Sequence, residues 1–300
     1  MLVNKQSIQQ VFRSLNTLFN KAFDKAESSW DKTAMLVNST TTTEDYAWLG
    51  TFPSLKEWVD EKTVKSLAAH DYSIKNKNWE ATVAVRRDDI EDDNLGLYGP
   101  MAQDAGESGR VWPDRLVSQL KFGAFTGFCY DGQYFYDTDH PVGGGVVSNK
   151  LTAPLSNATL AAAKACYGAA RTMIMSLKDE QGDPMGLMPG LLEVPPALET
   201  EARMLLENDK LADDTPNPYK GTAELLVNPW LKSDKQWFLH VVNRPLKPFI
   251  FQQRKAPVFV QQTDMENDDV FNRGIYKFGA EARGNVGYGL WQLSVGSDPA

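Results

Sequence analysis

The spacing of apolar and polar residues predicts a strand followed by a long helix between residues 79 and 124. Trp79 to Val85 form a run that favours β-structure, with apolar side chains nearly alternating. The charged run Arg86-Arg87-Asp88-Asp89 ends that strand. Beyond it, apolar residues recur at spacings of mostly three and four, as on one face of an α-helix: Tyr98, Ala102, Ala105, Trp112, Leu116 and Leu120. We expect the rest of the chain to be arranged around this strand and helix.

A proline in the middle of the long helix predicts an interruption. Pro113 lacks the N–H group that an α-helix needs, and its ring crowds the preceding turn. We therefore expect a break or a kink at residues 111–113, with Pro113 opening a second helical piece.

Three further segments have helical periodicity. Residues 4–27 predict an amphipathic helix, which packs either on its own domain or, as an arm, on a neighbouring subunit. Residues 157–178 are rich in alanine and give the clearest helical pattern in the chain. Residues 198–208 predict a shorter helix.

Residues 70–85 are interpreted as a hairpin with its tip at Asn76-Lys77-Asn78. Its two arms carry few large aliphatic residues, so we expect the hairpin to project from the core. An isolated two-stranded hairpin is marginally stable, and this one would need another chain to lie on.

An apolar strand that ends in an acidic run occurs twice. Residues 256–269 repeat the pattern of residues 81–93, and we interpret the two as adjacent strands of one sheet. Residues from about 145 to 245 would then be inserted between the two halves of one domain. Within that insertion we expect the end of a buried strand followed by a turn at 190–196, a strand at 222–228 and a buried strand at 237–242.

The composition is that of a globular chain with enough apolar material for a core. Of the 300 residues, 42% are hydrophobic, and the mean hydropathy is −0.40. The formal charge of −8 argues against a surface that neutralises nucleic-acid phosphates along its length. The 8 Trp, 10 Tyr and 14 Phe can fill a core and can also anchor contacts between proteins.

The two cysteines, Cys129 and Cys166, have no CxxC spacing, which favours a reducing compartment. The N-terminal residues lack an apolar stretch of the signal-peptide type. No run of about eighteen apolar residues occurs that would cross a membrane. We therefore expect a protein of the cytosol of the producing cell, without membrane association.

Catalytic and metal-binding motifs are sparse. The three histidines have neither HxxxH nor HExxH spacing. His240 lies in the apolar run 237–242 and is interpreted as a core histidine with satisfied hydrogen bonds. Gly143-Gly144-Gly145 lacks the lysine of a phosphate-binding loop.

The densest group of reactive residue types is segment 129–140. Cys129, Asp139 and His140 could be a nucleophile, an orienting group and a base. Asp137 and Asp139 could instead supply oxygen ligands to a hard cation. Residue types alone support either idea, and a structured surface loop is the preferred interpretation.

The charged run at residues 86–89 also has two interpretations. It forms surface salt bridges, which contribute little to stability, or it contacts another subunit. Residues 85–115 carry four basic and eight acidic residues, whereas residues 244–283 carry seven and five. Faces of opposite sign on neighbouring copies could therefore meet.

Six segments occur in an order and at a spacing that are typical of one protein family. They are residues 34–39 (AMLVNS), 48–58 (WLGTFPSLKEW), 85–93 (VRRDDIEDD), 129–133 (CYDGQ), 246–252 (LKPFIFQ) and 269–273 (DVFNR). In these segments the chain resembles the major capsid (major head) subunits of Mu-like tailed phages and prophages, which have the Hong Kong 97-type fold. The resemblance covers nearly the whole chain, although no single segment is chemically diagnostic.

The resemblance implies an α+β fold of four parts. These are an N-terminal arm (1–45), an extended loop (46–88), a peripheral domain with a long spine helix (89–144 and 251–288) and an axial α/β domain (145–250 and 289–300). In this family the extended loop lies on the neighbouring subunit. The residues expected at assembly contacts are Trp58, Lys75, Asn76, Lys77, Arg86, Arg87, Asp88 and Asp89.

The implied function is structural and not enzymatic, without a cofactor or metal. Copies would form hexamers and pentamers that close into an icosahedral shell around double-stranded DNA, without sequence-specific binding. The implied partners are other copies of the chain, a scaffold protein, a maturation protease and a portal. Assembly would take place in the cytoplasm of the host bacterium, and the product would be part of the virion. Two alternatives are an encapsulin-like compartment for protein cargo and a soluble enzyme that uses Cys129 and His140.

Overall fold

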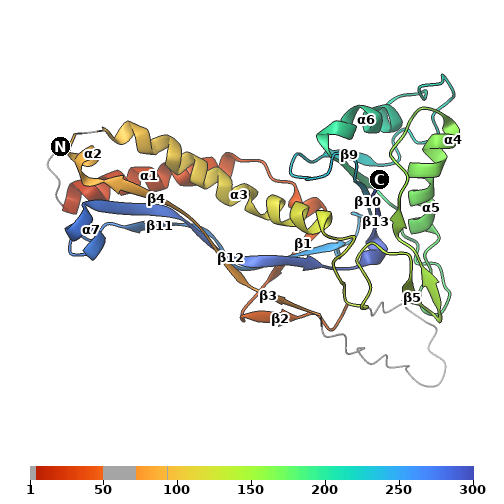
Figure 1. The fold of residues 1–300 in the computed structure, drawn as a ribbon, viewed down its shortest axis with the longest axis horizontal. Coiled ribbons are helices and arrows are strands. Elements are labelled where there is room, and N and C mark those ends of the chain that lie inside the picture. Colours follow the sequence, from red (N-terminus) through yellow and green to blue (C-terminus); the bar gives the residue numbers. More distant parts are fainter. Residues whose placement is uncertain (1–4, 50–71, 93) are drawn as a thin grey trace.

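A four-stranded sheet forms the long arm of the molecule in the computed structural model, which describes residues 5–49, 72–92 and 94–300 (Figure 1). Its strand order is β1-β11-β12-β4, with β1 (Ala34–Asn38), β11 (Phe249–Gln262), β12 (Ile275–Tyr288) and β4 (Lys77–Arg86). The β11–β12 and β12–β4 pairs are antiparallel, whereas β1 runs parallel to β11. Residues from near both ends of the chain thus meet in one sheet.

The two strands that repeat the apolar–acidic pattern, β11 and β4, share this sheet but are not adjacent. β12 lies between them, with Phe278 opposite Val83 on one side and opposite Gln261 on the other. The prediction of direct pairing was therefore wrong. The repeated pattern arises because both strands end at the same end of the sheet, where the short helices α2 (Arg87–Glu91) and α7 (Asp268–Arg273) follow (Figure 1).

Two long helices, α1 (Lys5–Lys25) and α3 (Tyr98–Phe122), cover one face of this sheet (Figure 1). Ile8 and Phe12 of α1 have no exposed surface, so its apolar face packs on its own chain. Of the two alternatives for residues 4–27, the structure supports packing within the subunit. The helices approach closely at Gly106, where a Cβ atom would lie 2.3 Å from the carbonyl oxygen of Phe19.

The long helix α3 is uninterrupted at Pro113, so the predicted break and the second helical piece are wrong, whereas the kink stays a prediction. The ring of Pro113 removes one backbone hydrogen bond. Buried residues on both sides of it, Trp112 and Leu116, are held in the core, and Trp112 packs edge-to-face on Phe251 with ring centroids 5.3 Å apart. This packing keeps both halves of α3 in one helix, against the local preference.

The predicted hairpin with its tip at Asn76 does not form. β3 (Ser73–Lys75) pairs with β2 (Thr43–Asp45), whereas β4 pairs with β12. Asn76 is buried between them, and its Nδ2 donates to Ser39 Oγ at 2.7 Å while its Oδ1 accepts from Gln252 Nε2 at 2.8 Å. The polar side chain that suggested a turn is satisfied inside the protein instead.

A second sheet of five strands lies at the other end of the molecule, in the order β7-β13-β10-β8-β9 (Figure 1). The strands are β7 (Lys150–Leu151), β13 (Ser294–Ser297), β10 (Trp237–His240), β8 (Leu191–Val194) and β9 (Glu224–Val227). All residues of β8, β10 and β13 are buried. The buried strands predicted at 190–196 and 237–242 are therefore confirmed as β8 and β10, and the strand predicted at 222–228 is the partly exposed β9.

Helices around this second sheet also match the periodic segments. Residues 160–175 are helical throughout, as α4 (Leu160–Ala163), the π-helix η3 (Lys164–Gly168) and α5 (Ala169–Met175). The side chain of Thr159 caps the first of these by accepting from the Ala162 N–H at 3.1 Å. The π-helix was not expected. The predicted helix at 198–208 is α6 (Glu199–Glu207).

The remaining elements are short. β5 (His140–Val142) and β6 (Gly145–Val147) form a hairpin whose two central residues, Gly143 and Gly144, have positive φ. Single 3-10 turns are η1 (Trp30–Lys32), η2 (Asn94–Leu97), η4 (Pro196–Leu198) and η5 (Trp291–Leu293). Within the described part of the chain, every helix is too short or too polar to cross a bilayer.

The main core lies where the two sheets meet. Aromatic rings from both halves stack there: Phe135 on Phe249 with centroids 4.9 Å apart, and Tyr136 on Phe238 at 5.6 Å. The chain crosses between the sheets through η5, which joins β12 to β13. The boundaries expected for the peripheral and axial domains stay a prediction.

Candidate functional site

The helices α2 and α7 lie together at one end of the long sheet (Figure 1). Exposed charges and exposed apolar side chains occur together there. We call α2, α7 and η2 together the distal end. Phe271 on α7 is 81% exposed, and Leu97 in η2 is 66% exposed. Exposed large apolar groups beside charges are typical of surfaces that contact another protein.

The charged run predicted at an assembly contact lies in this distal end, at the junction of β4 and α2. Arg87 Nε pairs with Glu91 Oε1 at 3.0 Å, with both side chains about half exposed. Asp89 Oδ2 accepts a hydrogen bond from the Tyr98 hydroxyl at 2.5 Å, and burial together with Asp89 raises the pKa of Tyr98. Arg86 and Asp88 are exposed. Arg87 and Asp89 thus have partners within the chain, whereas the charges of Arg86 and Asp88 face solvent.

The other predicted contact residues are not grouped with that run. Lys75 on β3 and Lys77 on β4 are exposed, whereas Asn76 between them is buried and hydrogen-bonded inside its own chain. A contact of these residues with another subunit stays a prediction. Trp58 lies outside the described residues.

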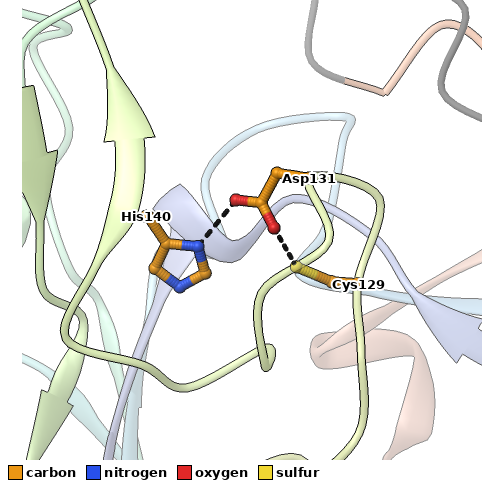
Figure 2. Close-up of side chains that lie close together, drawn as sticks. All are labelled: Cys129, Asp131 and His140. Carbon is orange, nitrogen blue, oxygen red and sulfur yellow. Dashed lines mark hydrogen bonds and ion pairs between the residues drawn. The ribbon is translucent and has the colours of Figure 1, made fainter. Parts of the chain in front are cut away.

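The loop that follows α3 brings Cys129, Asp131 and His140 together (Figure 2). Cys129 Sγ lies 3.0 Å from Asp131 Oδ1, and His140 Nδ1 lies 2.7 Å from Asp131 Oδ2. Asp131 is held in place by a turn, since Oδ1 also accepts from the Gln133 N–H at 3.1 Å and Gly132 has φ +84°. The carboxylate therefore lies between the thiol and the imidazole.

The position of the Asp131 carboxylate beside the Cys129 thiol does not promote ionisation of the thiol. Burial and the neighbouring Asp131 raise the pKa of Cys129 well above its ordinary value. Burial opposes ionisation of Asp131, but hydrogen bonds from His140 and Cys129 lower its pKa below the ordinary value. A nucleophilic cysteine needs a base beside it, and here the group beside it is an anion that keeps the proton on sulfur.

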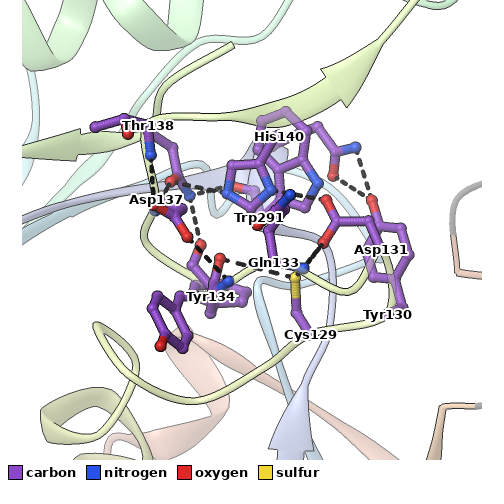
Figure 3. Close-up of polar contacts among 12 residues, drawn as sticks. Cys129, Tyr130, Asp131, Gln133, Tyr134, Asp137, Thr138, His140 and Trp291 are labelled. Carbon is purple, nitrogen blue, oxygen red and sulfur yellow. Dashed lines mark hydrogen bonds and ion pairs between the residues drawn. The ribbon is translucent and has the colours of Figure 1, made fainter. Parts of the chain in front are cut away.

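The sequence named the wrong aspartate for this cluster. Asp139 is exposed and has no part in it. Asp137 accepts backbone N–H groups of Tyr134 at 3.1 Å and Thr138 at 2.8 Å, so it shapes the loop rather than a cation site with Asp139 (Figure 3). Among the described residues, the one group of three or more His, Cys, Asp or Glu side chains placed to hold a metal ion is Cys129, Asp131 and His140.

A second buried cluster joins α3 to the five-stranded sheet and was missed from the sequence. Lys121 Nζ lies 2.6 Å from Glu193 Oε2, and the side chains are 2% and 0% exposed. Asn228 Nδ2 donates to Glu193 Oε1 at 2.6 Å. Burial favours the neutral acid, but Lys121 and His240 outweigh it and lower the pKa of Glu193 to about 2. The signal in the sequence was a single glutamate within the apolar run Leu191 to Val194.

His240 belongs to the same cluster and is a satisfied core histidine, as predicted. Nε2 lies 3.0 Å from Glu193 Oε2, and Nδ1 lies 2.9 Å from Ser294 Oγ. Its side chain has no exposed surface, and burial lowers its pKa.

Comparisons with known proteins agree over almost the whole chain. A family model described as Mu-like prophage major head subunit gpT matches residues 8–162, 152–231 and 232–300. The major capsid protein of Escherichia phage Mu is 33% identical over 295 residues, or 98% of this chain and 74% of that protein. The Mu-like prophage FluMu major head subunit of Haemophilus influenzae is 32% identical over 292 residues, or 97% and 73%.

Solved structures of phage capsids are also similar to this chain. The procapsid of bacteriophage JBD30 has a TM-score of 0.61 and 29% identity, covering 99% of this chain and 77% of that chain. The JBD30 capsid has a TM-score of 0.61 and 28% identity, covering 71% and 94%. A virus-like particle from Pyrococcus furiosus has a TM-score of 0.56 at 9% identity, covering 95% and 98%, and this likeness shows the fold alone.

These relatives are structural subunits of phage heads, which favours the capsid interpretation over the encapsulin-like and enzyme alternatives. The mixed helices and sheets described above agree with the expected Hong Kong 97-type fold. The chain therefore belongs to the family of Mu-like phage and prophage major head subunits and is a structural, non-enzymatic major capsid protein of the virion.

Proposed function

We propose that this chain self-assembles as hexamers and pentamers into the icosahedral head shell that encloses double-stranded phage DNA. The observation that carries the proposal is the distal end, where Phe271 is 81% exposed. Burying such a ring in a contact between subunits contributes about 1.5–3 kcal/mol, so its exposure in the isolated subunit favours association. Charges beside it, on Arg86 and Asp88, would set the orientation of the contact.

The net charge supports a container rather than a DNA-binding protein. A subunit with a net charge of −8 would enclose the duplex without binding its phosphates tightly along its length. No sequence-specific reading of DNA is part of the proposal.

The division into arm, extended loop, peripheral domain and axial domain remains part of the proposal. The two sheets support this division. The strands β7, β8, β9, β10 and β13 form one sheet, and they lie within residues 150–240 and 294–297. The strands β1, β4, β11 and β12 form the other. Lys75, Lys77 and the run from Arg86 to Asp89 are proposed as contact residues, together with Trp58.

We further propose a scaffold protein, a maturation protease and a portal as partners, and assembly in the cytoplasm of the host bacterium. Both a procapsid and a capsid of JBD30 resemble this chain, which agrees with assembly in stages.

The test is electron microscopy of the expressed full chain, alone and with its neighbouring genes. Wild-type protein is expected to form closed shells. Phe271→Ser is expected to leave dispersed subunits with an unchanged melting temperature, because an 81% exposed ring contributes little to its own fold. Phe128→Ser is the matched control, a 63% exposed phenylalanine in the loop before Cys129.

Three outcomes are informative. Shells from the Phe128 variant and none from the Phe271 variant support the distal end as a contact. Normal shells from both variants contradict that role while leaving self-assembly in place. Failure of the wild-type chain to form any ordered particle under both conditions contradicts the proposed function.

A further inference from the structure

We propose that Cys129, Asp131 and His140 form a binding site for one Zn²⁺ ion. One ligand atom from each residue can be chosen so that all three lie within 4.8 Å of one another. The three side chains come from the two ends of the 129–140 loop, and the Asp131 carboxylate lies between the Cys129 thiol and the His140 ring (Figure 2). A thiolate, an imidazole nitrogen and a carboxylate oxygen together form a ligand set that zinc prefers over magnesium or calcium.

Asn149 fixes which nitrogen of His140 carries a hydrogen. Asn149 Nδ2 faces three carbonyl oxygens, those of Phe135, Trp291 and Ser294, at 2.8, 3.3 and 3.2 Å. Its Oδ1 accepts from the Asp137 N–H at 2.9 Å, so the amide cannot be turned round. The same Oδ1 lies 3.1 Å from His140 Nε2, which must therefore donate.

The other ring nitrogen, Nδ1, then faces the cluster. It lies 2.7 Å from Asp131 Oδ2, a hydrogen-bond distance, so a hydrogen lies between these two atoms. Zn²⁺ binding would replace that hydrogen and would use Nδ1, the nitrogen that Asn149 does not hold. A histidine that binds a metal through one nitrogen and donates its other N–H to a fixed oxygen is the usual arrangement at metal sites.

A bound zinc ion would leave no net charge in this buried place. The Cys129 thiolate and the Asp131 carboxylate together carry two negative charges, which Zn²⁺ neutralises, and binding displaces the proton from Cys129 Sγ. Because no net charge is buried, the bound state avoids the large desolvation cost of an unpaired ion.

The ion would be a structural crosslink. His140 begins β5, and its ring stacks on Trp291 with centroids 4.0 Å apart and planes inclined by 10° (Figure 3). Trp291 lies in η5, which connects the two sheets. A metal bond from His140 to the turn at Cys129 and Asp131 would therefore fix the loop that packs on this connection, with a water molecule as the fourth ligand.

The test uses Co²⁺ as a spectroscopic probe on the full, reduced and metal-free chain. We expect one Co²⁺ per chain, with visible bands of tetrahedral cobalt and a near-ultraviolet thiolate-to-cobalt charge-transfer band. Added Zn²⁺ should abolish both. Cys129→Ser should remove the charge-transfer band, and Asp131→Asn should weaken binding at least about tenfold. Cys166→Ser is the matched control, since this second buried cysteine hydrogen-bonds elsewhere, to the carbonyls of Ser156 and Ala163, and should bind as the wild type does.

A second measurement uses the wild-type chain alone and so does not depend on whether a variant folds. Zn²⁺ added to the wild-type chain in weak buffer should release at least one proton per ion bound, because the Cys129 thiol binds as a thiolate. Release of none, absence of saturable binding, or equal cobalt spectra from the wild type and Cys129→Ser would overturn the proposal. Each of these results is independent of whether shells form.

Discussion

The Nζ atom of Lys121 lies 2.6 Å from Oε2 of Glu193, and water reaches neither group. Lys121 is in the last turn of the long helix α3, and Glu193 is in the middle of the five-stranded sheet. This ion pair therefore connects the two halves of the subunit at a buried point, where a lost partner leaves an uncompensated charge.

Removing one member of this pair is expected to be costly. Lys121→Met should lower the free energy of unfolding by about 3–5 kcal/mol, because Glu193 stays buried without its cation. The double variant Lys121→Met with Glu193→Leu should recover part of that loss, because no charge stays buried, but not all of it, because Asn228 and His240 lose their shared partner. Urea unfolding of both variants gives the comparison.

Lys255→Met is the control for that experiment. Its pair with Glu281 has the same type of partner at 3.0 Å, but both side chains are about half exposed. The expected loss is below about 1 kcal/mol. Equal losses for Lys121→Met and Lys255→Met would contradict the importance given to burial.

Acid should weaken the junction between the two halves. The pKa of Glu193 is about 2 in the fold against an ordinary value of 4.5, so its contribution is present above pH 4.5 and is lost as the pH falls towards 2. The lowered pKa of buried His240 acts in the same direction, since below its ordinary value of 6.5 the unfolded chain binds a proton that the folded chain does not.

Unfolding of dispersed subunits, followed between pH 7 and pH 2, would measure this dependence. Stability is expected to fall as the pH falls. A Glu193→Gln variant is less stable at neutral pH but should have a flatter profile between pH 4.5 and 2. If the free energy of unfolding of Glu193→Gln falls with pH as steeply as that of the wild type, groups other than Glu193 cause the acid sensitivity.

The contact of α1 with α3 gives a prediction about one glycine. Gly106→Ala would place Cβ 2.3 Å from the Phe19 carbonyl oxygen, so the two helices must move apart, at a cost of about 1–3 kcal/mol. Gly99→Ala in the same helix meets only Leu18 Cδ1 at 3.4 Å and should be neutral or stabilising by up to about 1 kcal/mol, because alanine favours helix. Thermal unfolding of the two variants would test this, and the reverse ranking would contradict the described packing.

The two aspartates at the start of α2 should behave differently on charge reversal. Asp88→Lys changes an exposed charge and should reduce shell formation while lowering the melting temperature little. Asp89→Lys also breaks the hydrogen bond from the Tyr98 hydroxyl and should reduce both. Microscopy paired with calorimetry separates the two effects. A loss of stability without loss of shells for Asp88→Lys would leave it as an ordinary surface residue.

The spacing of apolar residues along the chain was enough to locate several helices and strands of this protein. Three-and-four spacing located α1, α3 and α6, and the apolar run around His240 located β10, because each of these segments buries one face or both regardless of its partner. The order of short segments also sufficed for the family, and hence for the capsid function. Even the break expected at Pro113 was a sound local inference, which packing of Trp112 and Leu116 overruled.

Only the tertiary structure decided which residues meet. The periodicity of a strand shows which faces are buried but not which strand lies beside it, so the place of β12 between β11 and β4 was out of reach. Asn76 lies in a sequence typical of a turn. Its side-chain amide is nevertheless hydrogen-bonded inside the chain to Ser39 and Gln252, which are far away in sequence. Asp131 rather than Asp139 joins Cys129 and His140, because the turn at Gly132 directs its carboxylate inward. Hydrogen bonds and ion pairs between distant residues depend on the closed fold, and no local pattern contains that information.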